Sequence, residues 1–370
     1  MKFKRLFSAI VALNNLKVFK VLVACIFWIN PICAQAAKVL IYHHVSNTMP
    51  VSTSISPERF IAQMDYLENN DYKIVPLTEL TEKLKQGETL PDKTVAITFD
   101  DSYADVYTAA YPILKKHGWP FTFFVNTKSV GSGKLFVSWD QLREMSKNNV
   151  TIANHTIEHS HLVRLEKNES QAQWRVRIAN EITTAQRKIE AEIGNAPKIF
   201  AYPFGEYNNE LKQILKELDY LAFTQQAGVL SNETDLQILP RFPFGGSYTQ
   251  LNDFVEKINT LPLPVKHVEF YRDRDNKLSD MVVKAGDKPY LVLTLNDINL
   301  LKKVNCFSSN EGAIKVEIVG NKLWIQSKQA FPEGRTKFNC TAAGSQRGRF
   351  YWFTQLWLVT DKNGNWSYKD

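Results

Sequence analysis

The chain has 370 residues and a formal net charge of +7 at pH 7, from 45 Lys and Arg against 38 Asp and Glu. Residues 1–36 hold five positive charges and no negative charge, so the rest of the chain carries +7 − 5 = +2. The basic balance therefore belongs mainly to the N-terminal segment. Because no basic run with interleaved aromatic residues follows, we expect no nucleic-acid partner.

The first 36 residues predict an export signal peptide. A basic leader precedes the short apolar core Val21–Ile29, and Ala34-Gln-Ala36 resembles a signal-peptidase cleavage site. About nine apolar residues are too few to span a bilayer well. We therefore expect an exported protein, periplasmic, on the outer surface or secreted, with no stable membrane span after signal removal. An uncleaved anchor and lipoprotein-type cleavage at Cys25 are the alternatives.

The region 37–265 alternates β-strand and α-helix patterns. A Pro at the first helical position follows Ser56, and several later helix patterns stop at Gly. This alternation is typical of a parallel α/β barrel. Strands are expected at 38–45, 94–99, 120–125 and 150–154, and helices at 57–70, 77–86, 103–117, 181–193 and 208–218.

The pattern changes after Pro262-Leu-Pro264. From residue 268 to 370, short alternating segments separated by Gly and Asn turns predict a small β-sandwich. One hypothesis is that this domain is a glycan-binding module. Its aromatic residues Trp324, Trp352 and Trp357 stack on sugars under that hypothesis, or pack in the core. Cys306 and Cys340 remain after signal removal, and an even pair in an exported protein predicts a disulfide. Free buried thiols are the alternative.

Two carboxylates end the apolar strand Thr94–Phe99. Asp100 and Asp101 follow it directly, and unpaired charge is costly inside a core, so they are expected at the carboxyl end of a parallel strand. Successive side chains on a strand point to opposite faces. The two groups can therefore have different roles, such as a metal ligand and a base. A turn or a helix cap is the alternative.

A histidine cluster follows the next predicted strand but one. His155 and His159 come directly after the strand 150–154, and two His with one Asp make an open three-ligand metal site. The alternative is a solvated loop. A third element, Phe200–Tyr207, breaks into Pro and Gly and lets backbone approach a ligand, unless it is an ordinary turn. Trp139 is expected to stack on a sugar or to pack.

In this order, Thr-Phe-Asp-Asp, His-Thr-x-x-His and the Pro-aromatic-Gly loop resemble the polysaccharide deacetylases, the NodB-homology group of carbohydrate esterase family 4, over residues 38–264. The resemblance implies a distorted (β/α)7 barrel and a divalent metal, with Zn²⁺ preferred and Co²⁺, Ni²⁺ or Fe²⁺ as alternatives. By position, Asp100 matches the general base, and the Phe204 N–H matches an oxyanion donor. Tyr202 and Trp139 are expected at the substrate groove. The metal ligands implied are Asp101, His155 and His159.

Two positions depart from the family pattern. The stretch Phe200-Ala201-Tyr202 lacks the Arg that orients the base, and Arg241 is the candidate substitute. The late general-acid His is also missing. Instead, Tyr42-His43-His44-Val45 resembles the opening of the circularly permuted poly-N-acetylglucosamine deacetylases, which places the acid at His43, with His44 as the alternative.

The resemblance implies an exported, metal-dependent enzyme. Its expected reaction is hydrolysis of N-acetyl groups on a polysaccharide that contains N-acetylglucosamine, such as poly-N-acetylglucosamine, giving free amines and acetate. Chitin oligosaccharides, peptidoglycan and O-acetylated xylan are alternative substrates. A catalytically inactive, glycan-binding barrel is the alternative from another functional class, because the base-orienting Arg and the acid are both displaced.

Overall fold

The computed structural model describes residues 36–344 and 346–366. The expected signal peptide therefore lies outside the described residues, apart from Ala36. Among the helices of the described part, none is both long enough and apolar enough to cross a membrane.

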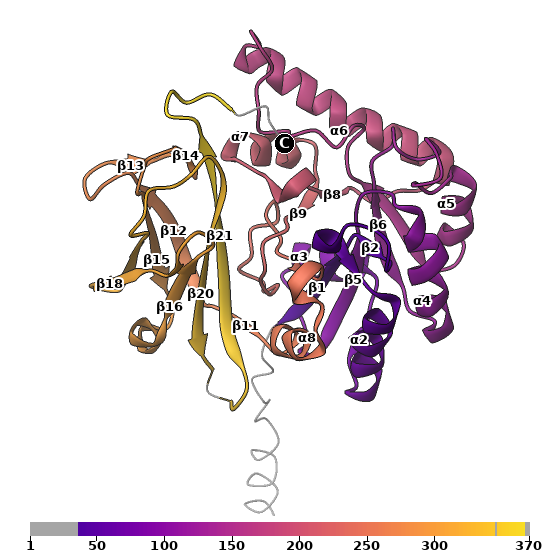
Figure 1. Cartoon of the computed structure of the whole chain (residues 1–370), viewed down its shortest axis with the longest axis horizontal. Coiled ribbons are helices and arrows are strands. Elements are labelled where there is room, and N and C mark those ends of the chain that lie inside the picture. Colours follow the sequence, from indigo (N-terminus) through magenta and orange to yellow (C-terminus); the bar gives the residue numbers. More distant parts are fainter. Residues whose placement is uncertain (1–35, 345, 367–370) are drawn as a thin grey trace, which may run out of the picture. The chain divides into compact units, whose positions relative to one another are not determined.

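The first part of the chain forms a curled parallel sheet flanked by helices (Figure 1). Its strands follow the order β10-β1-β5-β6-β7-β8-β9, with β4 beside β5, and every neighbouring pair is parallel. The strands are β1 (Ala37–Tyr42), β4 (Lys73–Ile74), β5 (Thr94–Phe99), β6 (Phe121–Val125), β7 (Val150–Asn154), β8 (Ile199–Ala201), β9 (Leu221–Phe223) and β10 (Phe242–Pro243). A parallel sheet of this kind confirms the predicted α/β fold.

The stretch 239–243 connects the two edges of this sheet. Leu239 bridges Phe223 of β9, and Phe242 pairs with Leu40 of β1. The strands from β1 through β9, which this stretch joins back to β1, thus curl into a distorted ring. This arrangement agrees with the predicted distorted (β/α)7 barrel. A further short pair, β2 (His44–Val45) with β3 (Ser54–Ile55), follows β1.

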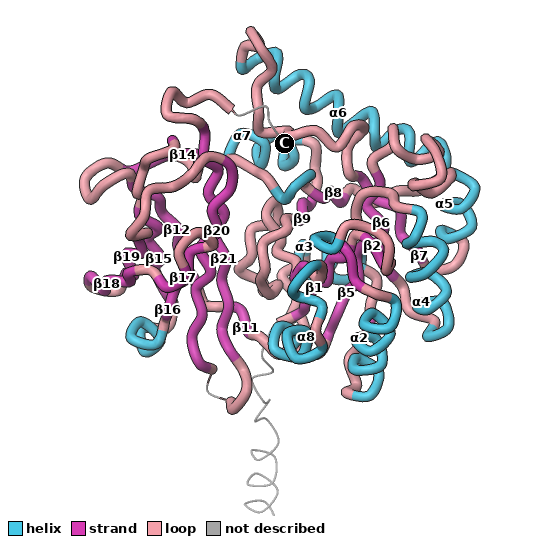
Figure 2. Tube along the Cα trace, viewed as in Figure 1, coloured by secondary structure: helices cyan, strands magenta, loops and turns pink. Residues whose placement is uncertain are grey.

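Helices cover the parallel sheet (Figure 2). They are α2 (Pro57–Asn69), α3 (Leu77–Lys85), α4 (Tyr111–His117), α5 (Trp139–Ser146), α6 (Gln171–Ile193), α7 (Asn209–Glu217) and α8 (Leu251–Ile258). Ser56 caps α2 by accepting the Arg59 N–H, as its position before Pro57 predicts. The helix α4 ends at Gly118, whose φ of 68° suits glycine.

The helix α6 begins ten residues before the predicted start at 181. Ser170 and Gln173 form a reciprocal capping box at its N-terminus. Trp174, Ile178 and Ile182 then bury one stripe of the helix at the usual helical spacing. The early turns were missed because the first buried residue of the stripe is a single Trp among polar residues.

After the parallel sheet, the chain forms two strand-rich sheets. The six-stranded sheet contains β11 (Leu261–Pro262), β14 (Val282–Lys284), β16 (Asn305–Ser308), β17 (Gly312–Ala313), β20 (Gly334–Ala343) and β21 (Phe350–Thr360). The five-stranded sheet contains β12 (Val265–Tyr271), β13 (Lys277–Leu278), β15 (Tyr290–Leu295), β18 (Lys315–Val319) and β19 (Lys322–Gln326). Figure 2 shows this region as strands joined by loops, with one short helical turn.

Apolar side chains from both strand-rich sheets belong to one hydrophobic cluster. Trp357 is fully buried there against Phe338 and Phe331, so its predicted alternative role in sugar stacking is wrong. Cys306 and Cys340 stand directly opposite one another on β16 and β20 and form a disulfide with an S–S distance of 2.03 Å.

Candidate active site

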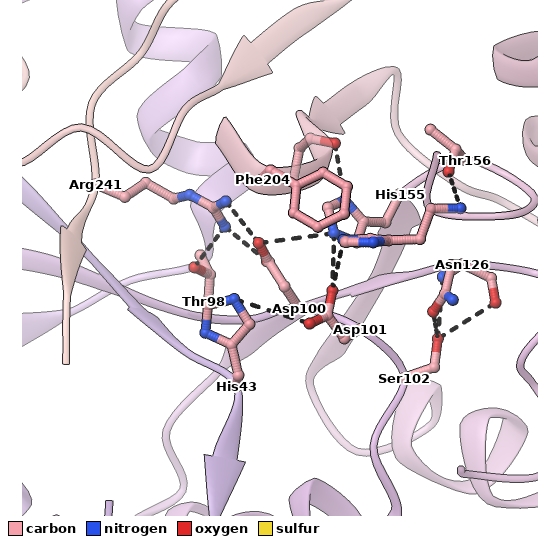
Figure 3. A network of polar contacts seen from close by, with 12 residues as sticks. His43, Thr98, Asp100, Asp101, Ser102, Asn126, His155, Thr156, Phe204 and Arg241 are labelled. Atoms are coloured by element: carbon pink, nitrogen blue, oxygen red, sulfur yellow. Dashed lines mark hydrogen bonds and ion pairs between the residues drawn. The ribbon is translucent and has the colours of Figure 1, made fainter. Parts of the chain in front are cut away.

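Four predicted site residues lie at the carboxyl ends of parallel strands, and a fifth, Arg241, reaches them from the amino end of β10 (Figure 3). Asp100 and Asp101 follow β5, His155 follows β7, His43 follows β1, and Arg241 directly precedes β10. In parallel α/β proteins this edge of the sheet is where ligands bind, because every crossover returns the next strand in the same direction. Residues far apart in the sequence therefore meet at one place.

Asp101, His155 and His159 form the three-ligand group that the sequence predicted. Their candidate ligand atoms lie within 4.8 Å of one another. Asp101 Oδ1 is 3.1 Å from Nε2 of both histidines. Nε2 of His159 is buried, and its contact with Asp101 lacks hydrogen-bond geometry. A carboxylate oxygen and two imidazole nitrogens that converge in this way form a donor set that fits a divalent metal.

Backbone geometry and a hydrogen bond orient these ligands. His155 donates its Nδ1 hydrogen to the Ala201 carbonyl over 2.8 Å, which leaves the Nε2 lone pair directed at the ligand group. Asp101 and His159 have φ angles of 74° and 59°, in the left-handed region. Left-handed backbone is unfavourable for residues other than Gly and is concentrated at functional sites.

The charges within the ligand group stabilise one another. Burial would raise the pKa of Asp101, but the imidazoles of His155 and His159 outweigh burial and hold that pKa well below its usual range. Burial would lower the pKa of His155, but Asp100 and Asp101 outweigh it and raise that pKa. A metal ion would compete with protons for the same ligand atoms.

Asp100 is held by Arg241. The guanidinium donates from Nη1 to Oδ1 and from Nη2 to Oδ2, both at 2.7 Å, and both side chains are fully buried. Arg241 also donates to the Thr98 hydroxyl and, from Nε, to the Thr224 carbonyl. Such a bidentate pair fixes the carboxylate plane. Arg241 therefore fixes the orientation of Asp100, and its role as substitute for the family Arg stays a prediction.

The two adjacent histidines face different surroundings. His43 Nε2 lies 3.9 Å from Asp101 Oδ2, at the edge of the ligand group. His44 is buried, pairs with Asp105 through Nδ1 at 2.6 Å and stacks on Tyr103. Burial lowers the pKa of His43, although Asp101 raises it in part. The geometry thus brings His43 to the ligand group, whereas His44 pairs with Asp105.

The comparisons with known proteins agree with this geometry. Residues 87–223 match the family described as polysaccharide deacetylase. The Bacillus subtilis (strain 168) protein YxkH, whose name places it among polysaccharide deacetylases, is 30% identical over 215 residues, covering 58% of this chain and 73% of YxkH. The chain belongs to the polysaccharide deacetylase family. It is therefore a hydrolase of that family.

Two further proteins are similar to this chain. The Escherichia coli (strain K12) poly-β-1,6-N-acetyl-D-glucosamine N-deacetylase is 27% identical over 272 residues, covering 63% of this chain but 40% of that relative. The solved structure of IcaB from Ammonifex degensii has 27% identity and a TM-score of 0.53, covering 59% of this chain and 96% of that one. The chain thus spans two fifths of the E. coli relative and nearly all of the IcaB structure.

The loop after β8 brings Phe204 to the site of the deacetylase. Phe204 lies in the turn Pro203–Gly205 with a φ of 58°, and its ring stacks on His161 at 3.8 Å and meets His159 edge-on at 4.6 Å. Sequence reasoning missed Glu206 in the same loop. It is buried and accepts from His161 Nδ1 at 2.7 Å, and a charged residue beside Pro-Phe-Gly was the available signal.

The two expected groove residues lie elsewhere. Tyr202 is fully buried in the core, and its hydroxyl donates to the Gln237 carbonyl, so its predicted contact with substrate is wrong. A ring of that size gains more by burial than by exposure at a strand end. Trp139 is half-buried at the start of α5, with Lys188 Nζ of α6 5.4 Å from its ring. This places Trp139 at a helix–helix contact, and sugar stacking stays a prediction.

Proposed function

We propose that this chain is an exported, metal-dependent N-deacetylase of a polysaccharide that contains N-acetylglucosamine, with poly-β-1,6-N-acetylglucosamine as the first candidate substrate. One observation carries the proposal: the group Asp101, His155 and His159 lies beside a buried Asp100 that Arg241 orients. The names of the E. coli relative and of its counterparts in Staphylococcus aureus support the choice of glycan.

Asp100 is suited to act as the general base. A divalent ion held by the three ligands would polarise the acetyl carbonyl and lower the pKa of a nearby water. Asp100 Oδ2 lies 4.0 Å from His155 Nε2, so the carboxylate borders the same space as the ligand atoms. Arg241 uses one lone pair of each oxygen, and a carboxylate oxygen has two. Asp100 therefore keeps the capacity to accept a proton from the attacking water.

His43 and Phe204 act on the other two atoms of the amide. As water adds to the carbonyl carbon, negative charge grows on the acetyl oxygen, and the Phe204 N–H donates to it. The C–N bond then breaks, and protonated His43 donates its proton to the leaving nitrogen. Burial lowers the pKa of His43, which makes its protonated form a stronger acid. Water and the acetamide group thus give acetate and a free amine.

The inactive glycan-binding alternative loses its main support. It rested on a missing base-orienting Arg and a displaced acid. Arg241 pairs with both oxygens of Asp100, and His43 lies at the ligand group. A binding protein has no need for a fully buried Asp–Arg pair beside three convergent metal ligands, because such pairs are costly to desolvate.

Acetate release tests the proposal. Purified protein loaded with Zn²⁺ is incubated with poly-β-1,6-N-acetylglucosamine, chitin oligomers, peptidoglycan and acetylated xylan, and acetate is measured over time. We expect the fastest release from the first glycan. Asp100→Asn keeps the side-chain shape and one acceptor, and it is expected to slow release about 10²–10⁴-fold with metal content unchanged.

Two results would decide against the proposal. Release from xylan esters alone would replace amide hydrolysis by ester hydrolysis. Equal release from Asp100→Asn and wild type would remove Asp100 from its role as the base. Export is tested separately, by sequencing the N-terminus of the protein recovered outside the cytoplasm: a start at residue 37 is expected, and a retained residue 1 contradicts signal cleavage.

A further inference from the structure

An arginine from the strand-rich region reaches the loop that carries Phe204. Arg335 lies on β20, and its Nη1 donates to the Phe204 carbonyl over 2.9 Å. Its Nε is 3.7 Å from Glu206 Oε1, and its guanidinium carbon is 5.8 Å from the Phe204 ring centre. One side chain, 131 residues away in sequence, thus contacts two residues of this loop.

The loop has a backbone conformation that needs support. Phe204 and Gly205 both have left-handed φ angles, 58° and 68°. For Phe204 this conformation is unfavourable and persists only where neighbours hold it. On its inner side the loop packs tightly, since a Cβ at Gly205 would meet Gln225 Cβ at 2.7 Å. Lys337, two residues beyond Arg335 on β20, donates to the Gln225 carbonyl at 3.4 Å.

Glu206 provides a second reason for the contact. Its side chain is only 4% exposed, and a buried carboxylate is costly unless positive charge and hydrogen bonds surround it. His161 lies 2.7 Å from one carboxylate oxygen, and Arg335 and Arg164 lie 3.7 and 4.0 Å from the other. The same guanidinium therefore compensates Glu206 and anchors the carbonyl two residues before it.

We propose that Arg335 is a positioning residue for the reaction, so that the strand-rich region completes the active site. The inference rests on the proposed function, because Phe204 N–H is the donor to the acetyl oxygen. The N–H and the carbonyl of Phe204 are linked through its own two backbone dihedrals. Anchoring the carbonyl restricts the rotation that would turn the N–H away from the acetyl oxygen. Preorganised donors of this kind carry much of the rate enhancement of acyl transfer.

Three variants of the full chain test the inference. Arg335→Ala removes the anchor, and Arg335→Lys keeps the charge and one donor. Arg274→Ala is the matched control, because Arg274 is similarly exposed and pairs with Glu317 at 2.7 Å on the other sheet. We expect Arg335→Ala to lower kcat about 10-fold to 100-fold, with KM and metal content near wild type. Arg335→Lys is expected to recover part of kcat, and Arg274→Ala to keep it.

Hydrogen exchange supplies a second measurement that does not depend on the substrate. The Gly205 and Glu206 amides donate to Tyr202 and Pro203 within the loop, so loosening the loop raises their exchange rates. We expect faster exchange at these amides in Arg335→Ala and unchanged exchange in Arg274→Ala. Faster exchange with unchanged kcat would overturn the positioning role, and unchanged exchange would overturn the anchor.

The outcomes separate the two proposals. If wild-type protein releases no acetate from any glycan, the proposed function fails, while the exchange rates still decide whether Arg335 holds the loop. If Arg335→Ala lowers kcat and metal content together, or lowers its melting temperature far more than Arg274→Ala does, the contact is structural and the inference is overturned.

Discussion

Two groups of charged side chains in this protein have nearly the same distances and opposite surroundings. At the mouth of the barrel, Asp100 and Arg241 meet at 2.7 Å, and both side chains are fully buried. On the five-stranded sheet, Glu269 meets Lys277 at 2.6 Å and Lys322 at 2.7 Å, with Lys277 exposed and Lys322 partly exposed. Distance alone does not distinguish the groups.

The difference in burial determines how strongly the protein depends on each pair. A buried pair has lost its hydration, so removing one partner leaves an uncompensated charge in the interior. An exposed pair contributes little, because water and salt replace either partner. The barrel mouth therefore depends on each charge that it holds, whereas the sheet surface tolerates substitution. Under the proposed function, the buried pair orients the carboxylate that acts as the base.

Of the changes considered, removal of the bound metal should have the largest effect on acetate release. A chelator is expected to reduce acetate release to background, since the ligands alone cannot polarise the substrate carbonyl. Added Zn²⁺ should restore release. The measurement is acetate production before and after dialysis against the chelator, with Glu269→Gln as the control that behaves like wild type. Full activity of metal-free protein would exclude a metal-dependent reaction.

Substitutions of the two adjacent histidines should lower kcat by different amounts. His43→Ala is expected to lower kcat about 10²–10⁴-fold, because an amine leaves poorly without a proton donor. His44→Ala loses the contact with Asp105 and is expected to lower kcat less than about tenfold, with a lower melting temperature. Steady-state kinetics on one N-acetylated glycan checks both. The reverse order of effects would make His44 the acid.

Substitution of Arg241 should affect stability as well as activity. Arg241→Leu leaves Asp100 buried and unpaired, so we expect the free energy of unfolding to fall by about 3–5 kcal/mol. The double variant Asp100→Leu with Arg241→Leu is expected to recover much of that stability but no activity. Urea unfolding of wild type and variants measures these differences. A loss below about 1 kcal/mol in the single variant would place the pair in the same class as surface pairs.

Substitution of Glu269 should have the smallest effect. Hydrogen bonds from Lys277 and Lys322 lower the pKa of Glu269 to about 2. A folded-state pKa below the unfolded value stabilises the protein above about pH 4.5, and this contribution is lost as the pH falls towards 2. Glu269→Gln is thus expected to cost at most about 1 kcal/mol at pH 7. Unfolding curves at pH 7, 4 and 2.5 should show the difference shrinking, and a constant difference would contradict the assignment.

Sequence reasoning reached the ligand group because its signals are local. Asp101, His155 and His159 each stand directly after an apolar strand or within five residues of one, and parallel strands bring such ends together. Arg241 was identified only as a candidate, because its contact with Asp100 depends on the stretch 239–243 joining both edges of the sheet. That closure has a weak local signal.

The remaining features depend on tertiary packing. No periodicity or motif in the sequence predicts that Arg335 contacts a loop 131 residues earlier. Tyr202 was misplaced because a ring beside a functional loop was assumed to face the groove, whereas burial of its apolar area decided its direction. Trp357 was left open between core and surface, and alternation along β21 could not choose between its two faces without the second sheet.

The closing stretch 239–243 also sets the order in which Asp100, the proposed base, gains its partner. A ribosome-bound chain that has released its first 200 residues already contains every metal ligand, but its Asp100 has no guanidinium partner. Chains fold from the N-terminus as they emerge, and contacts between distant residues form late. Burying the carboxyl group of Asp100 without a partner is costly, so closure of the sheet around it depends on Arg241. The stretch 239–243 thus supplies in one piece both the closure of the sheet and the charge that pairs with Asp100.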